Sequence, residues 1–272
     1  MGILHRRKEC GTQTRMARSF LKAANSLISL IVVLSLCVAG LYAAYALWDN
    51  HRVYASAENI QADLLKLKPV TEEDGGASFA ELLALNPDVC AWVTLDNTMV
   101  DHPVLQGETN LTYINRDVYG NFALVGSIYV DSRNHRDFSD SYCLLYGHHM
   151  ENGGMFGDLD LYHDEEFFQN NTTGTLILPD RIYHLEIFAC LLTKASDQAI
   201  FSPEQWQTDI DELLPYVEEN SMYLHTETIA KLEQMENPQV LALSTCSSEF
   251  TDARTIILAV MNPGHTANQE EE

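Results

Sequence analysis

The stretch LALSTCSSEFTDARTIILAV, Leu241 to Val260, contains two apolar runs separated by a polar segment. Short apolar runs rich in β-branched residues are typical of buried strands, so we expect strands at 240–244 and 255–261. Cys246 directly follows the first strand and Arg254 opens the second. If the two strands pair, the excursion of eight residues between them brings Arg254 back beside the thiol of Cys246.

Other short β-branched and aromatic runs, separated by turn residues, fill the chain from Val89 onward. The further predicted strands lie within 89–106 and at 126–130, 141–146, 174–178 and 184–193. Runs of this kind favour a mainly β domain with a mostly antiparallel, closed sheet over alternating βαβ units. Two helical stretches, 157–168 and 203–223, interrupt the strands. The longer one carries an apolar stripe at helical spacing that we expect to face the core: Trp206, Ile210, Leu213, Leu214 and Val217.

Near the N-terminus, residues 27–47 form a run of 21 residues without charge. At about 1.5 Å per residue a helix of this length spans the ~30 Å hydrocarbon core of a bilayer. Basic residues gather on its N-terminal side, which places 1–26 in the cytoplasm and the remaining chain outside. A cleaved signal peptide is the alternative, with an A-x-A-like site at Ala55–Ala57, but its apolar region is usually about 7–15 residues.

The charge is divided unevenly along the chain, whose net charge is -23. Residues 1–47 carry +5 and the remaining residues carry -28. An acidic body repels a polyanion, which argues against nucleic acid as a partner. A soluble, self-repelling surface is the simplest explanation of this charge.

The predicted organisation begins with a basic cytoplasmic tail and a transmembrane anchor and continues outside the membrane. A short helix with Ser78 as N-cap and Glu81 as its capping-box partner opens the folded domain. The expected segments are the tail 1–26, the transmembrane helix 27–47, an extracytoplasmic linker with a helix at 48–77, the folded domain 78–262 and a disordered acidic tail 263–272.

Four of the six cysteines are expected outside the membrane, which is too few for a disulfide scaffold over the residues that follow the anchor. Cys90, Cys143 and Cys190 lie in apolar runs, where a small buried hydrophobe is the default interpretation. A Cys90–Cys143 or Cys143–Cys190 bridge stays open at this stage. Cys10 is expected in the cytoplasm and Cys37 in the membrane.

A cysteine nucleophile needs a histidine to exchange protons and a donor for the oxyanion. His148 also follows a predicted strand, so Cys246, His148 and Arg254 together form a candidate catalytic set. Taken singly, each is more often a structural thiol, a surface imidazole or a solvated charge. Neither H-E-x-x-H nor C-x-x-C spacing occurs, and phosphate-binding glycine loops are missing, so we expect no metal and no cofactor.

These residues resemble the class B sortases, the membrane-anchored cysteine transpeptidases of Gram-positive bacteria. The family signature T-L-x-T-C matches Leu243 to Cys246, with Ala242 in place of the first threonine, which bears on fine substrate preference. The family's histidine block resembles LLYGHHMENGGMFGDL, Leu144 to Leu159, and its arginine falls on Arg254. Two further stretches resemble the first strands and the groove-lining segment of the family: Asn86 to Gln106 and Asn110 to Gly120.

The resemblance implies a sortase β-barrel with N-terminal helices and a long helix before the cysteine strand. It implies that Cys246 attacks the threonine carbonyl of an N-P-x-T-x-like sorting signal, that His148 transfers protons and that Arg254 stabilises the oxyanion. An amine of peptidoglycan precursor then resolves the thioacyl enzyme. The residues implied for the substrate groove are Asn110, Ile114, Tyr146, Ser244 and Thr245. Three alternatives stay open: pilus polymerisation, hydrolysis by a cysteine endopeptidase, and a binding module without catalysis.

Overall fold

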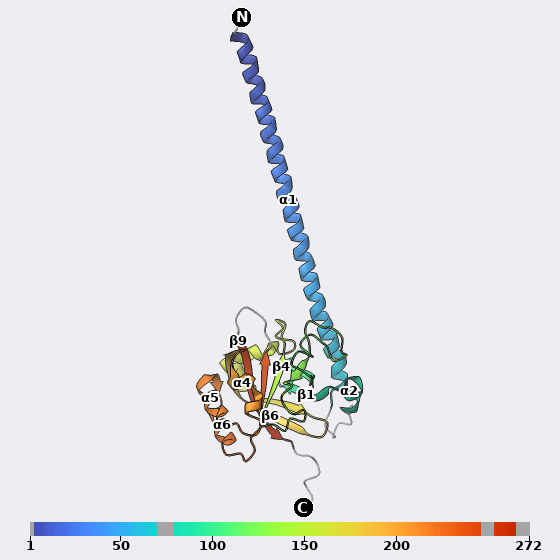
Figure 1. The fold of residues 1–272 in the computed structure, drawn as a ribbon, viewed down its shortest axis with the longest axis vertical. Coiled ribbons are helices and arrows are strands. Elements are labelled where there is room, and N and C mark those ends of the chain that lie inside the picture. Colours follow the sequence, from blue (N-terminus) through green and yellow to red (C-terminus); the bar gives the residue numbers. More distant parts are fainter. Residues whose placement is uncertain (1–2, 70–78, 246–252, 265–272) are drawn as a thin grey trace, which may run out of the picture. The chain divides into compact units, whose positions relative to one another are not determined.

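The computed structural model describes residues 3–69, 79–245 and 253–264, with side chains from Met16 onward. The chain divides into two compact units, Met1–Tyr54 and Ala55–Glu272. The first unit is helical, and its helix α1 (Ile3–Leu64), drawn in blue in Figure 1, continues into the first residues of the second unit. By length and composition this helix can cross a membrane, with a mean hydropathy of 2.5 in its apolar window. The helix expected in the linker 48–77 is therefore the last part of α1.

Several predicted features lie outside the described residues. They are the N-cap Ser78, the nucleophile Cys246 and residues 265–272 of the acidic tail.

The second unit is built from nine strands and several short helices within the described residues. The strands are β1 (Val89–Leu95), β2 (Asp101–Leu105), β3 (Ile128–Val130), β4 (Tyr142–Gly147), β5 (Thr173–Ile177), β6 (Ile182–Lys194), β7 (Ser221–Leu224), β8 (Val240–Thr245) and β9 (Ala253–Pro263). The helices are α2 (Phe79–Leu85), α3 (Glu165–Asn170), α4 (Gln198–Phe201), α5 (Leu213–Asn220) and α6 (Thr226–Leu232). The 3-10 helices are η1 (Leu65–Leu67), η3 (Gly157–His163) and η4 (Pro203–Gln205).

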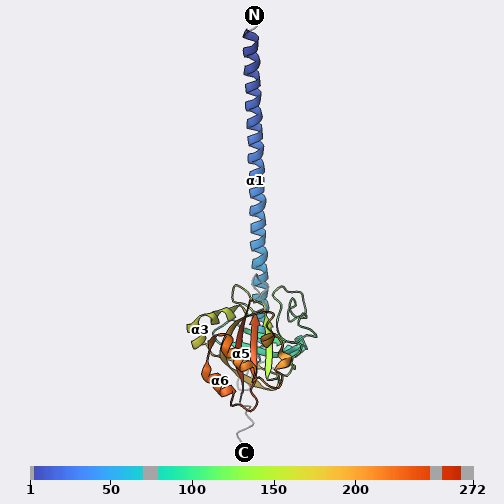
Figure 2. The same cartoon turned by 60° about the vertical axis from the view of Figure 1, so that its left-hand side comes forward.

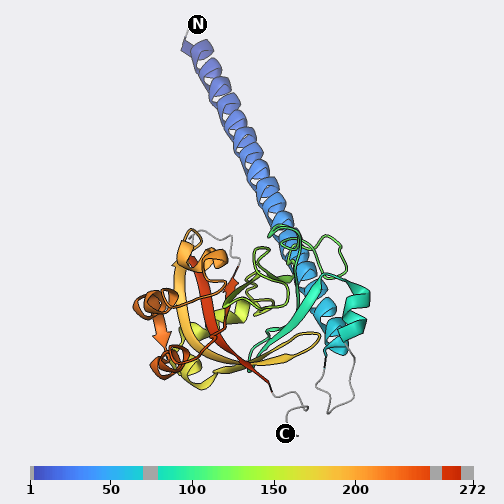
Figure 3. The same cartoon turned by 60° about the horizontal axis from the view of Figure 1, so that its bottom comes forward.

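Eight of the strands close into a barrel, which confirms the predicted fold class. Their hydrogen-bonded order is β5-β1-β2-β3-β4-β8-β9-β6, and β5 also pairs with β6 to complete the circle. The ninth strand, β7, extends the sheet from β6. Figures 1 and 3 show α5 and α6 together on one side of the barrel and α2 on the opposite side, and Figure 2 shows α3 on the outside.

Two pairings in the barrel are parallel, β2 with β3 and β4 with β8, and the others are antiparallel. β4 and β8 are buried almost throughout, which fits their nearly continuous apolar sequences. Parallel strands end at the same edge of a sheet. The residues that follow β4 and β8 therefore start from one edge of the barrel.

The segment between β6 and β8 corrects the expectation of one helix over 203–223. Here η4, α5 and β7 follow one another. The Asp209 carboxylate accepts a hydrogen bond from the Asp211 amide at 2.7 Å, which makes a turn before α5. After α5 the chain pairs with Ala189–Leu191 of β6, and this pairing overrides the helical spacing. The apolar stripe does pack against the core as predicted, with Trp206 partly buried and its other members buried.

The described cysteines Cys37, Cys90, Cys143 and Cys190 are all free, so neither candidate disulfide forms. Cys90, Cys143 and Cys190 are buried, as the apolar runs predicted. Burial raises the pKa of Cys90 and of Cys190 to about 12, and it raises the pKa of Cys143 well above its ordinary value. Thiols of this kind hold their protons at neutral pH and are poor nucleophiles.

Candidate active site

The ends of β4 and β8 define the candidate site. Their register runs in parallel from Tyr142↔Val240 to Gly147↔Thr245. His148 follows Gly147 directly, and Cys246 follows Thr245. Cys246 lies outside the described residues, whereas the strand that leads to it is described up to Thr245. Neighbouring strands lie about 4.8 Å apart, so Gly147 and Thr245, the last residues of the two strands, lie side by side at this edge.

Arg254 reaches the same edge from β9. β8 and β9 pair antiparallel, and the last pair toward this edge is Ser244↔Ile256. Arg254 lies on β9 just beyond that pair, opposite Thr193 of β6. Its side chain is partly buried, and Nη1 donates a hydrogen bond to the Ala253 carbonyl at 3.4 Å. Within the described ranges Arg254 forms no ion pair, so its guanidinium is not neutralised by a described carboxylate.

His148 is held at two points. Its Nε2 lies 2.6 Å from the Ile114 carbonyl oxygen, and its own carbonyl accepts a hydrogen bond from the Phe156 amide at 3.0 Å. A carbonyl oxygen can only accept, so we assign the proton to Nε2. In the neutral ring Nδ1 then carries the lone pair and is the atom available to a reaction partner.

Two glycines make this arrangement of His148 possible because their neighbours leave no room for a Cβ atom. At Gly147 a Cβ would lie 2.4 Å from Ile128 Cδ1 and 2.7 Å from the Phe156 ring. At Gly126, which has φ +58°, a Cβ would lie 2.4 Å from the carbonyl oxygen of Ile114. That oxygen is the hydrogen-bond partner of His148, so a side chain at residue 126 would displace the carbonyl that holds His148.

Asn110 and Tyr146, both predicted for the groove, meet at one buried carboxylate. Asn110 Nδ2 and Tyr146 Oη each donate to Asp131 Oδ2 at 2.9 Å. Asn110 Oδ1 accepts from the Ser132 amide at 2.7 Å, so both ends of this amide are fixed. Ile114 lies at the neighbouring point of the site, where its carbonyl holds His148. The structure thus brings these three predicted residues to one side of the strand ends.

Asp131 is charged because hydrogen bonds outweigh its burial. Burial raises the pKa of this carboxyl, but the hydrogen bonds from Arg133, Tyr146 and Asn110 together lower it by more than burial raises it. The pKa of Asp131 therefore lies below its ordinary value. Arg133 makes two bonds to Asp131, at 2.9 and 2.8 Å. Such a bidentate pair has a defined geometry as well as a favourable energy.

Arg133 also ties the segment after β6 to this carboxylate. Its guanidinium donates to the Phe201 carbonyl at 2.7 Å and pairs with Glu204 at 2.8 Å. The Phe201 ring stacks on Tyr146 at 6.3 Å with an interplanar angle of 12°. Sequence reasoning missed Asp131 and Arg133, although an acid and an arginine two residues apart at the end of an apolar strand were a usable signal.

Ser244 and Thr245, the other residues predicted for the groove, have buried side chains. Ser244 is fully buried, and its Oγ donates to the Thr245 carbonyl at 3.3 Å. Thr245 is 2% exposed, and its Oγ1 accepts from the Thr255 amide at 3.2 Å. Both side chains are therefore buried at the end of β8, where their hydrogen bonds hold the last residues before Cys246.

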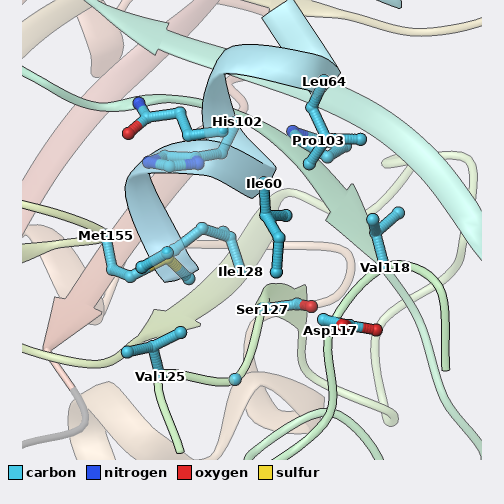
Figure 4. Close-up of a pocket in the computed structure, with 13 residues that line it drawn as sticks. Ile60, Leu64, His102, Pro103, Asp117, Val118, Val125, Ser127, Ile128 and Met155 are labelled. Atoms are coloured by element: carbon cyan, nitrogen blue, oxygen red, sulfur yellow. The ribbon is translucent and has the colours of Figure 1, made fainter. Parts of the chain in front are cut away.

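A small pocket of about 40 Å³ lies in the second unit. Figure 4 shows Ile60 of α1 pointing into it between Met155 and Val118, with His102 of β2 nearby. Burial lowers the pKa of His102 to about 4, so this imidazole is neutral at neutral pH. None of the predicted site residues lines the pocket, but two residues that border the site, Gly126 and Ile128, do.

The donors needed for a metal centre do not come together in the part of the chain that the structure describes. Within those ranges no three His, Cys, Asp or Glu residues could hold a metal ion.

Comparison with known proteins points to the class B sortases, the family that the sequence motifs resemble. No protein-family model matches the chain. Sortase B of Listeria monocytogenes is 29% identical over 234 residues, which cover 85% of this chain and 92% of that protein. The crystal structure of a Streptococcus pyogenes class B sortase involved in pilus biogenesis is 34% identical, with a TM-score of 0.61, and covers 68% of this chain and 97% of its own. The Staphylococcus aureus sortase B–substrate complex is 25% identical, with a TM-score of 0.60, covering 78% and 95%.

The closed eight-stranded barrel and its likeness to sortase B enzymes identify the chain as a cysteine transpeptidase of the sortase type. The chain belongs to the class B sortases.

The contact between Gly126 and Ile114 predicts a selective effect of adding one methyl group. Gly126→Ala should lower the free energy of unfolding by about 1–2 kcal/mol for the left-handed backbone and roughly 1–3 kcal/mol more for the clash. Gly120→Ala is the matched control, because Gly120 has φ +82° but nothing within 4 Å of its Cβ position. Urea unfolding and the NMR signals of the His148 ring measure the outcome. Equal costs for the two variants, with unmoved His148 signals, would contradict this account.

The depressed pKa of Asp131 predicts a pH-dependent loss of stability. This group stabilises the fold above its unfolded pKa of about 3.9, and the contribution is lost as the pH falls through the lower folded pKa. Asp131→Asn should therefore be less stable than the wild type by roughly 1–3 kcal/mol at pH 7, and the difference should shrink below about pH 4. Asp180→Asn, which removes an exposed partner of Arg181, is the control and should stay within about 0.5 kcal/mol. A difference independent of pH would show that Asp131 acts through packing alone.

Proposed function

We propose that Cys246, His148 and Arg254 are the catalytic residues of this sortase. The observation that supports this assignment is the register at the strand ends. Gly147 pairs with Thr245, and Ser244 pairs with Ile256. Continuing both registers brings the residue after β4, the residue after β8 and Arg254 to a common edge.

In the proposed reaction the sulfur of Cys246, whose thiol proton has passed to His148, attacks the carbonyl carbon of a threonine in the sorting signal. The tetrahedral intermediate collapses, the C–N bond breaks, and the leaving amine takes a proton from His148. The thioacyl enzyme is then attacked by an acceptor amine, which gives its proton to His148. The C–S bond breaks, the thiolate leaves, and a new amide is formed without a net change of redox state.

The bond from His148 Nε2 to Ile114 supports a role for Nδ1 in both proton transfers. Because Nε2 is engaged with a carbonyl in either half-reaction, Nδ1 is the nitrogen that gains and loses the proton. Arg254 is suited to the oxyanion because its planar guanidinium offers several donors and is always charged.

For the substrate we propose a sorting signal of the N-P-x-T-x type, bound along the side where Asn110, Ile114 and Tyr146 lie. The Asp131 carboxylate and Arg133 hold this side rigid. Ser244 and Thr245 contribute through the position of the strand end, since their side chains are buried. An amine of the peptidoglycan precursor is the proposed acceptor. A pilin lysine is a second candidate, favoured by the relative involved in pilus biogenesis.

For the location we propose a single-pass membrane protein with residues 1–26 in the cytoplasm, the anchor at 27–47 and the catalytic domain at 78–262 outside. The apolar helix and the basic residues before it support this orientation. An enzyme placed there has access to secreted substrates and to lipid-linked wall precursor.

The test of the proposed reaction is an acyl adduct on Cys246. Full-length protein in detergent is incubated with N-P-x-T-x-like peptides, with and without a glycine peptide as amine, and examined by intact mass. We expect an adduct that turns into an amide product when the amine is added, and no adduct with Cys246→Ala or His148→Ala. An adduct resolved only by water would identify a hydrolase. An adduct on another cysteine would refute the assignment of the nucleophile.

Arg254→Lys tests the oxyanion role separately. Lysine keeps the charge and loses the planar set of donors, so the rate of acylation should fall by about 10²- to 10³-fold. Lys194→Arg, at the end of β6 and opposite Ala253, serves as a charge-conserving control. An acylation rate of Arg254→Lys equal to that of the wild type would remove Arg254 from this role.

A further inference from the structure

A chain of hydrogen bonds joins residues that adjoin all three proposed catalytic residues. The sequence neighbours involved are Thr245 before Cys246, Thr255 after Arg254, and His149 after His148. Asp160 of η3 contacts Thr255 and His149, and Thr255 in turn bonds to Thr245.

The first link fastens β9 to β8 beyond the last paired residues. The backbone ladder between these strands ends at Ser244↔Ile256. One residue further, the amide of Thr255 donates to Oγ1 of Thr245 at 3.2 Å. The threonine side chain thus continues the connection between the two strands up to the positions next to Cys246 and Arg254.

The second link runs from Thr255 into η3. Its Oγ1 donates to Asp160 Oδ1 at 2.9 Å and lies 3.1 Å from His163 Nε2. A hydroxyl has one proton, so with Asp160 as acceptor His163 is the donor to Thr255. Asp160 and His163 are three residues apart on a 3-10 helix, which places both side chains on one face. Thr255 is 4% exposed, so its end of these bonds is buried, whereas Asp160 lies at the surface.

The third link reaches the histidine loop. The other oxygen of Asp160, Oδ2, lies 2.7 Å from His149 Nε2. His149 follows His148, and residue 149 also forms a bridge with Met155. Asp160 therefore accepts from β9 with one oxygen and contacts the loop of the catalytic histidine with the other.

We infer that Thr255 and Asp160 are positioning residues, which fix the end of β9 relative to the histidine loop and so set the distances among Cys246, His148 and Arg254. They do not contact the reacting atoms. This inference rests on the proposed function, since it concerns the placement of those three residues.

The substrate side is held by a different set of contacts. Asn110 and Tyr146 depend on Asp131, which shares no hydrogen bond with Thr255 or Asp160. Loss of the Thr255–Asp160 link should therefore slow the chemical step and leave the binding of peptide nearly unchanged.

The main test is Thr255→Val in the full-length protein in detergent, which removes Oγ1 and keeps the shape of the side chain. We expect kcat to fall about 10- to 100-fold, because a displacement of the catalytic residues by about 1 Å can slow the reaction to this extent. KM should change less than about twofold. Thr255→Ser restores the hydroxyl and should return kcat to within about threefold of the wild type. Asp160→Ala should act in the same direction, and since Asp160 lies at the surface this variant does not threaten folding.

Thr228→Val is the matched control. Thr228 is 5% exposed and donates to Glu186 at 2.9 Å, so it loses an equivalent bond. Glu186 pairs with Val260, about 17 Å along β9 from Thr255. This variant should keep the kcat of the wild type.

The inference is overturned if Thr255→Val and Asp160→Ala fold and turn over like the wild type, or if Thr228→Val loses as much kcat as Thr255→Val. It is also overturned if Thr255→Ser fails to restore kcat. If none of the peptides acylates the wild type, the proposed function fails and the inference needs another measurement. That measurement is the rate at which iodoacetamide alkylates Cys246. That rate should change in Thr255→Val and stay the same in Thr228→Val, and equal rates would overturn the inference.

Discussion

The parallel pairing of β4 with β8 is the constraint on which the site depends. A parallel pair needs a long crossover between its strands, and the chain supplies it with β5, β6, β7 and the helices between them. In return both strands end at one edge, at Gly147 and Thr245. An antiparallel pairing of the same two strands would send His148 and Cys246 to opposite ends of the barrel.

Two sets of side-chain hydrogen bonds hold the residues around that edge. Asp131 gathers Asn110, Tyr146 and Arg133 on one side, and Thr255 connects Thr245 with Asp160 on the other. A buried charge is stable only when it is paired and hydrogen-bonded, so each contact depends on its partners. The two sets of contacts have different roles: the first holds residues of the proposed groove, and the second holds residues next to the proposed catalytic residues.

Much of the fold follows from local sequence patterns. Short β-branched runs predicted the strands, and apolar surroundings predicted the burial of Cys90, Cys143 and Cys190. The class of the enzyme came from motifs in the family's order. Residues 203–223 were harder because β7 forms only through its pairing with β6, which no local pattern encodes. Asp131 and Asp160 escaped notice for a similar reason, since their partners lie far away in sequence.

The central claim is that the strand ends bring the three proposed catalytic residues together. A crystal structure of the protein trapped as the acyl enzyme tests it most directly, through the distance between Cys246 Sγ and His148 Nδ1. The account predicts a separation within about 7 Å, with the Arg254 guanidinium beside the acyl oxygen. A separation of more than about 10 Å, or an acyl group on another residue, would contradict it.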